Sequence, residues 1–403
     1  MHPLPRLLRL LLIIILAPLL LLAAGTGMVA LLLGSEAGTH FLAGQVASRA
    51  GDTVQWSRLE GTLLGPLRLN GLKLSMPGLD LSIDDLYLSW HPPGLLEGRV
   101  QVDTLRGQGI QLVLSATAEE PGQSAFNPGD ISLPVAVELG NIAFSDLLVT
   151  VDGQTPVQID SLELDAQLEN QQLSLRSLAV RLPQGGFNLG VDTVLAASMP
   201  LQAQLSWDWL LALPEAPADT ASGNHRVAPL KGDLALEGNL QWGERIAFDL
   251  HYQLAAEGLQ ALDGALPEQI KAGGDIQGTQ GTDELLLQQF SLIVADTPLA
   301  LSLAGQVASL ETTEPRANLT LQWRGLNWPL HVQEADIASS SGSLTLEGTL
   351  SKYQLELAAE LAGRDIPPGQ WALAGHGNAS QLVLEELSGQ VLGGHLSVSG
   401  ELE

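Results

Sequence analysis

The stretch GDLALEGNLQW, residues 232–242, carries the pattern that governs most of this chain. Leu234, Leu236 and Leu240 alternate with polar or small residues, and a period of two is typical of a β-strand with one apolar and one polar face. A near copy, GSLTLEGTL, occupies residues 342–350, so both segments follow G-x-L-x-L-E-G-x-L. The chain therefore repeats a strand motif, although no strict period of 20–50 residues runs through it.

The same alternation extends outward from these two segments over most of the chain. It recurs at residues 67–74, 79–90, 110–114, 135–139, 157–168, 173–182, 299–305, 353–361 and 393–402. Turn residues arrive about every 8–12 residues, which favours short strands, on the order of 30 in all. The sequence predicts an all-β body.

Three local irregularities give specific expectations. The Asn70-Gly71 pair inside LRLNGLKL predicts a tight hairpin turn. The alternation slips between Ile83 and Leu86, which predicts a turn or bulge at Asp84-Asp85. The apolar segment WDWLLAL at residues 207–213 predicts one or two helical turns, with a loop at 214–229 after it and another at 116–130.

The amino terminus predicts a membrane anchor. Residues 10–34 carry no charged side chain, and the roughly 24 residues from Leu10 to Leu33 would make about 36 Å of helix, enough for a hydrocarbon core of about 30 Å. Leu10, Ile14, Pro18, Leu22 and Leu33 mark this expected span, and Pro18 is a site for a kink. A cleavable signal peptide is the alternative, because small residues lie at 23–25.

The charges flanking this span predict its orientation. Arg6 and Arg9 lie in residues 1–9, so the positive-inside rule places this tail in the cytoplasm and the body outside it. Ser35 and Glu36 suit a helix start, which predicts a short juxtamembrane helix over residues 35–50. Residues 51–403 are then a translocated, repetitive β-domain.

Composition excludes several functions. The net charge is -27, which repels nucleic acid, and the chain has no cysteine for a disulfide or thiolate site. We find no histidine pair with metal-ligand spacing, no phosphate-binding loop and no serine nucleophile motif. His376 and His395 lie beside glycines and are predicted to be turn residues. The sequence predicts no enzyme activity, no metal and no cofactor.

The apolar strand faces need a partner, and alternation alone leaves two solutions open. A closed sandwich or barrel buries these faces against one another, and this is the commoner solution. An open, curled sheet instead leaves a continuous apolar channel that needs lipid in water. A structural or adhesive envelope protein with closed β-sandwiches and no lipid cargo is therefore the alternative function.

The order of several segments resembles the TamB family, within the AsmA-like, bridge-like lipid-transfer group. The resemblance rests on the apolar amino terminus followed by LLGSEAGTHFL at 32–42, LEGTLLGPLRLNGLKL at 59–74 and LSWHPPGLLEGRVQVDTLRGQGIQLVL at 88–114. Later, WRGLNWPL at 323–330 and SSSGSLTLEGTL at 339–350 extend it. It covers the amino-terminal portion of the family, whose members are several times longer, and leaves open whether this chain is a fragment or a short relative.

The resemblance implies an elongated, curled β-sheet, the β-taco, with an aliphatic groove, anchored in the Gram-negative inner membrane and lying in the periplasm. It also implies phospholipid transport towards the outer membrane and a role in outer-membrane protein assembly and secretion. A TamA-like outer-membrane barrel would be the partner, through a carboxy-terminal region that we do not find here. The leucine phase supplies the groove candidates: Ile110, Leu112, Leu114, Leu162, Leu164, Leu234, Leu236, Leu344, Leu346, Leu355 and Leu357.

Overall fold

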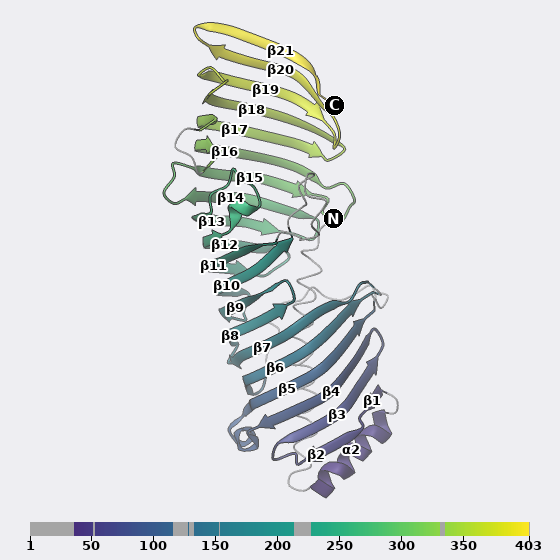
Figure 1. The fold of residues 1–403 in the computed structure, drawn as a ribbon. Helices are drawn as coiled ribbons and strands as arrows, with labels where there is room; N and C mark the ends of the chain where they lie inside the picture. Colours follow the sequence, from purple (N-terminus) through teal and green to yellow (C-terminus); the bar gives the residue numbers. More distant parts are fainter. Residues whose placement is uncertain are drawn as a thin grey trace. The chain divides into compact units, whose positions relative to one another are not determined.

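The computed structural model describes residues 36–50, 53–115, 128, 133–152, 154–212, 227–330 and 335–402. These residues form one α-helix, short 3-10 segments and 21 β-strands, which confirms the all-β body (Figure 1). The chain divides near residue 165 into two compact units. Unit 1 comprises the described residues up to Asp165 except Pro128 and Leu133, which belong to unit 2 together with the residues from Ala166 onward.

The helix α2 spans Glu36–Ala50, inside the range expected for a juxtamembrane helix. Glu36 lies in its first turn and Arg49 in its last, and both charges suit the helix dipole. Membrane anchoring itself stays a prediction, because residues 10–34 lie outside the described residues. Among those that are described, we find no helix with the length and hydropathy of a membrane span.

Unit 1 is a sheet with one parallel pairing. Its strands are β1 (Val54–Gln55), β2 (Arg58–Gly61), β3 (Leu67–Met76), β4 (Leu79–Trp90), β5 (Arg99–Leu114), β6 (Ala136–Val151) and most of β7 (Val157–Glu169). A 3-10 segment, η2 (Pro92–Glu97), links β4 to β5. The β1–β3, β2–β3, β3–β4 and β4–β5 pairs are antiparallel, whereas β5 and β6 run parallel.

The predicted hairpin at Asn70-Gly71 is wrong, because β3 runs through it, and β4 likewise runs through Asp84-Asp85 without a turn. Gly71 has a φ of 62° and Gly109 of β5 a φ of 65°, a left-handed conformation that glycine adopts without strain. A Cβ on Gly109 would lie 2.2 Å from Asp84 Oδ2. The strands therefore continue through the change of alternation, because glycines on the neighbouring strands adopt a positive φ. Ile83 and Leu86, on either side of this change, are both buried.

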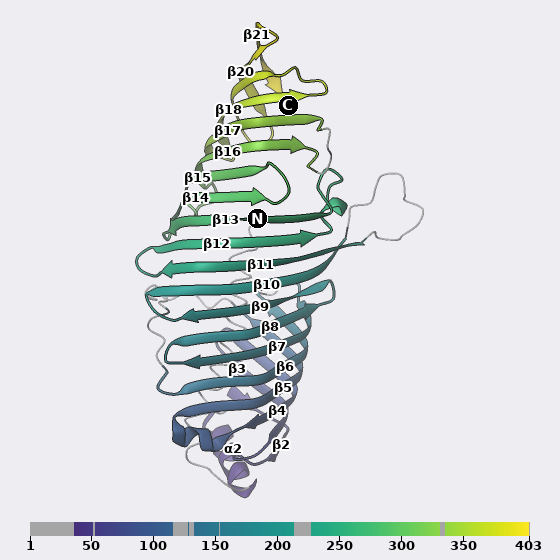
Figure 2. The ribbon, with the colours of Figure 1, turned by 90° about the vertical axis from the view of Figure 1, so that its left-hand side faces the viewer.

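Unit 2 is an antiparallel sheet in which the paired strands are neighbours in sequence (Figures 1 and 2). After the end of β7, its strands are β8 (Gln172–Leu182), β9 (Gly185–Val194), β10 (Ser198–Ala212), β11 (Val227–Gln241), β12 (Ile246–Glu257), β13 (Gln269–Gln280), β14 (Glu284–Val294), β15 (Ala300–Ala308), β16 (Arg316–Trp328), β17 (Ile337–Thr349), β18 (Lys352–Gly363), β19 (Gly369–Gly377), β20 (Leu382–Val391) and β21 (Gly394–Leu402). The 3-10 turn η4 (Leu259–Ala261) lies between β12 and β13. Within the described ranges β8 and β21 are not paired with each other, so this sheet is open.

Several local predictions in unit 2 need correction. Trp207–Ala212 of WDWLLAL lie in strand β10 and not in a helix, and Val227–Pro229, expected in a loop, open β11. Residues 214–226 of that expected loop lie outside the described residues. His376 and His395 lie in strands β19 and β21. The strands of this unit have 9 to 15 residues, which is why they are fewer than the short strands predicted. Most of the predicted loop 116–130 lies outside the described residues.

Candidate functional site

The alternating leucines of unit 2 all point to one side of its sheet, which we call the inner face. Strand register aligns them into rows, because paired residues point to the same side. One row runs through Leu189, Leu205, Leu234 and Leu254 from β9 to β12. A second row runs from β15 to β20 through Leu303, Leu321, Leu344, Leu357, Leu373 and Leu387.

The structure gives the predicted groove residues two different environments. In unit 1, Ile110, Leu112, Leu162 and Leu164 are at most 7% exposed, and Leu114 is half-buried. In unit 2 the corresponding leucines are all half-buried: Leu234, Leu236, Leu344, Leu346, Leu355 and Leu357. Among the predicted groove residues, those of unit 2 are therefore the more accessible set.

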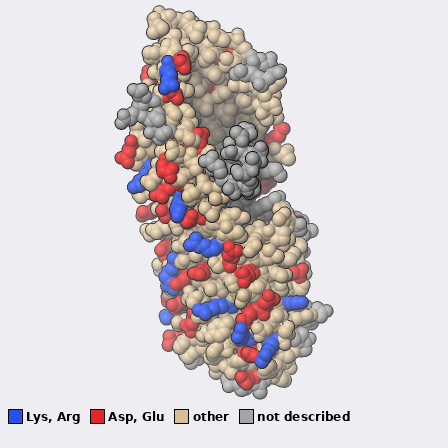
Figure 3. All heavy atoms as spheres, viewed as in Figure 1, with Lys and Arg blue, Asp and Glu red and all other residues tan. Residues whose placement is uncertain are grey.

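The inner face of unit 2 carries no charge at the row positions named above. Acidic and basic residues occupy the other strand phase, such as Glu237 between Leu236 and Gly238, and Glu347 between Leu346 and Gly348. In Figure 3 the upper part of the molecule is hollowed, and the visible floor of that hollow shows no Lys, Arg, Asp or Glu. A surface of this kind binds apolar chains through the area it removes from water.

Flat indole rings cover glycines on the neighbouring strand of this face. A Cβ on Gly232 would lie 2.2 Å from Trp207 Cζ2, and one on Gly342 would lie 2.1 Å from Trp323 Cζ2. Gly232 and Gly342 are the first residues of the two near-identical segments. The repeated motif therefore encodes a strand whose glycine receives the tryptophan of the preceding strand.

Some aromatic side chains of unit 2 have a hydrogen-bond partner for their polar atom, and one buried indole nitrogen does not. Trp323 Nε1 donates to Ser339 Oγ at 2.8 Å, and Ser339 is 2% exposed. Tyr252 stacks on Phe290 and donates its hydroxyl to the Ser291 carbonyl at 2.8 Å, and burial raises the pKa of that hydroxyl. Trp371 Nε1 is buried without a hydrogen-bond partner in the described part of the chain. These rings pack against the sheet and have a structural role on the inner face.

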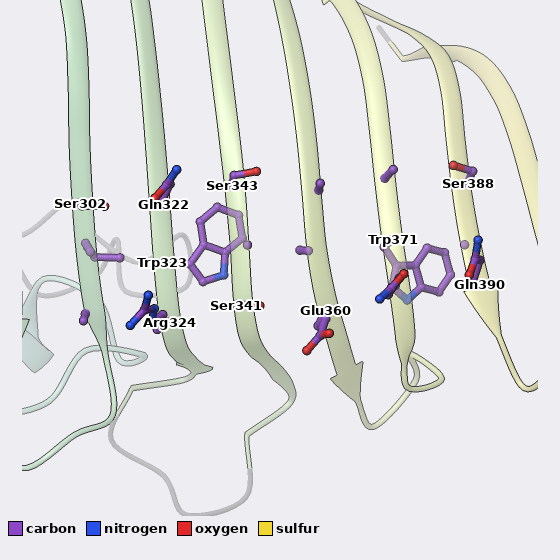
Figure 4. A pocket seen from close by; sticks show the side chains of 18 of the residues that line it. Ser302, Gln322, Trp323, Arg324, Ser341, Ser343, Glu360, Trp371, Ser388 and Gln390 are labelled. Carbon is purple, nitrogen blue, oxygen red and sulfur yellow. The ribbon is translucent and has the colours of Figure 1, made fainter.

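A second hollow, of about 740 Å³, lies over strands β14–β20 (Figure 4). Its lining includes Ser291 and Ile293 but not Leu292 between them, so it opens on the polar face. Gln322 and Arg324 flank Trp323 there, and in Figure 4 they lie on either side of its ring. Side chains next to an inner-face residue point the opposite way, so these polar groups do not reach the leucine rows.

We find no metal centre among the described residues. No group of three or more His, Asp or Glu side chains could hold a metal ion there. His376 Nδ1 lies 2.8 Å from Glu385 Oε1 on an exposed surface, and His251 Nδ1 lies 3.0 Å from Asp275 Oδ1. Both are pairs between side chains of adjacent strands. Sequence reasoning missed the indole-glycine pairs, although the position of Gly232 and Gly342 within the repeat was a visible signal.

A family model described as TamB, N-terminal domain, matches residues 26–155 and 282–403, which is more than half of the chain. The matched ranges take in α2, the strands of unit 1 up to β6, and unit 2 from β14 onward. No solved structure matches the chain.

Proposed function

This chain belongs to the TamB N-terminal domain family, and from that premise we propose that the inner face of unit 2 binds the acyl chains of phospholipids and lets them move from strand to strand along the leucine rows. The observation that carries the proposal is a row of half-buried leucines without a charge, on an open sheet. Apolar surface of this extent is costly in water, at about 25 cal/mol per Å², and a lipid chain relieves that cost.

The position of the protein in the cell is part of this proposal. We propose that residues 10–34 anchor the chain in the inner membrane and that the β-strands lie in the periplasm. Phospholipid would then pass towards the outer membrane, in support of outer-membrane protein assembly and secretion, with a TamA-like barrel as partner. Family membership supports these points, together with the uncharged amino-terminal segment.

The alternative is a structural or adhesive protein without cargo, which requires closed β-sandwiches. An open sheet with half-buried leucines does not fit that requirement in unit 2.

Photo-crosslinking in the full chain tests the proposal. A crosslinking residue replaces Leu357 on the inner face or, as the matched control, Ala358 on the polar face of the same strand, and mass spectrometry detects attached phospholipid. We expect adducts at Leu357 and not at Ala358. Equal adducts at both positions, or none at Leu357 and Leu236, would disprove the proposed function.

A further inference from the structure

Two connections of unit 2 meet at one end of its strands, although a complete hairpin separates them in sequence. Residues 258–268 join β12 to β13, and Trp328–Leu330 leads out of β16. The Leu330 N–H donates to the Ala265 carbonyl oxygen at 3.1 Å. Because β14 and β15 lie between these connections, the contact passes over the end of that hairpin. We call Leu259–Leu266 together with Trp328–Leu330 the strap.

The β12–β13 side of the strap is an ordered structure. It starts at Gly258, whose N–H donates to the Glu268 carbonyl at 2.9 Å, and continues through the 3-10 turn η4, the short green coil in front of β14 in Figure 1. Asp263 Oδ1 then accepts from the Ala265 N–H at 2.8 Å. Ala265 is therefore presented to Leu330 at a fixed position.

The strap covers part of the inner face. Leu330 packs against a small core of Ala272, Val294 and Leu299, which are 5–8% exposed. Ala272 pairs with Leu254 of the first leucine row, so this core belongs to the same face as the proposed lipid surface. The candidate leucines on either side, Leu236 and Leu344, are only half-buried.

The side chain of Leu330 thus occupies a place where an acyl chain would otherwise lie. We infer that the strap is a gate, which covers the inner face of β13–β16 at the strand end that holds Ala272 and has to open before acyl chains pass there between β8–β12 and β17–β21. This inference rests on the proposed function and adds its regulation. The contacts across the strap include one backbone hydrogen bond and one packed leucine, and local opening of a connection at the strand ends can break both.

A reversible lock tests the gate. The chain has no cysteine, so Ala265→Cys with Leu330→Cys introduces a single possible disulfide. A backbone contact this short brings the two Cα atoms near the roughly 4.4–6.8 Å that a disulfide spans. In the full chain, photo-crosslinking residues at Leu236 and at Leu357 report phospholipid on the two sides of the strap.

Locking should change the two positions differently. After oxidation we expect the ratio of phospholipid adduct at Leu357 to adduct at Leu236 to fall by roughly tenfold, and to recover when the disulfide is reduced. The variant Leu330→Ala, which empties the occupied place without a lock, should raise that ratio. As a matched control, Gln306→Cys with Asn318→Cys joins paired residues on the polar face, and its oxidation should leave the ratio unchanged.

The failures of the two proposals look different. An unchanged ratio in the oxidised lock, with adducts at both positions, overturns the gate and leaves the lipid surface standing. Absence of adducts at both positions in every redox state and in the unlocked chain overturns lipid binding, and the gate with it.

Discussion

Units 1 and 2 have the same alternation of leucines, yet the apolar side chains named below are less exposed in unit 1 than in unit 2. In unit 1, Val102 and Ile142 are 1% exposed and Leu162 is 3% exposed, whereas Leu236 and Leu346 of unit 2 are half-buried. The difference follows the neighbours of the leucines. Valine and isoleucine share the buried set of unit 1 with leucine, while strands of unit 2 carry glycines at inner-face positions next to the leucines, such as Gly342 and Gly348 beside Leu344 and Leu346. Alternation predicts a face, and the residues beside the leucines determine whether that face is closed.

The largest effect should come from a charge placed on each face. Ile142→Asp should unfold unit 1, because burial of an unpaired carboxylate costs several kcal/mol, comparable to the whole stability of a domain. Leu346→Asp should fold, since its carboxylate reaches water, but should abolish phospholipid adducts at Leu357. Circular dichroism during thermal unfolding checks the first expectation and crosslinking the second. Equal loss of structure in both variants would erase the contrast between the units.

Shortening a leucine to alanine should also destabilise unit 1 more than unit 2, with a smaller effect than the introduced charge. Leu162→Ala should lower the free energy of unfolding by about 2–5 kcal/mol, because it leaves a cavity in a closed core. For Leu346→Ala we expect about 1 kcal/mol, since that side chain is already partly in water. Urea unfolding of the two variants measures the difference, and matching values would mean that unit 2 is as tightly packed as unit 1.

A third change tests whether glycine keeps the inner face open. Gly342→Ala places a Cβ 2.1 Å from Trp323 Cζ2, so the ring has to move and its bond to Ser339 is lost. We expect a loss of about 1–3 kcal/mol and a shift in tryptophan fluorescence. Gly243→Ala is the control, because its nearest neighbour is Arg245 O at 3.6 Å. Similar spectra for both variants would show that the indole does not depend on the glycine.

The smallest effect is electrostatic and belongs to unit 1. Hydrogen bonds from Arg68, at 2.8 and 2.7 Å, lower the pKa of the Asp85 carboxyl. A carboxyl with a lowered folded-state pKa contributes stability above its unfolded-state pKa, near 3.9, and loses it as the pH falls through the folded-state value. The pair is largely exposed, so its contribution is small.

Replacing Asp85 isolates this contribution. Asp85→Asn should be slightly less stable than the natural chain at neutral pH, and the two should converge below about pH 4. Acid titration followed by circular dichroism gives the midpoints. A constant difference down to pH 2 would assign the stability to packing instead of ionisation.

Sequence reasoning predicted the regular parts of the fold and missed the exceptions. Period-two leucines led correctly to strands, and the expected helix at 35–50 matches α2. The Asn70-Gly71 turn failed because a glycine with positive φ fits inside a strand as well as in a hairpin. WDWLLAL failed because Trp207, Trp209 and Leu211 also satisfy a strand period.

The sequence predicted which alternate residues of each strand share the apolar face. It did not predict whether that face is accessible. The open curled sheet came from the family resemblance, because alternation alone favoured closed sandwiches. The strap could not be predicted, since its contact joins Ala265 to Leu330 across 65 residues and leaves no local pattern. Exposure depends in the same way on tertiary neighbours, which a single sequence does not reveal.

The neighbour-to-neighbour pairing of unit 2 has a consequence for how the chain folds. From β8 to β21 each paired strand adds to the one made just before it, so the contacts are local and ordering proceeds hairpin by hairpin, in the direction of synthesis or export. The parallel pair β5–β6 of unit 1 departs from this rule, because its two strands cannot meet as a tight hairpin. Unit 2 can therefore assemble as fast as it emerges, while the β5–β6 pair of unit 1 has to wait until the whole connection between Leu114 and Ala136 has emerged.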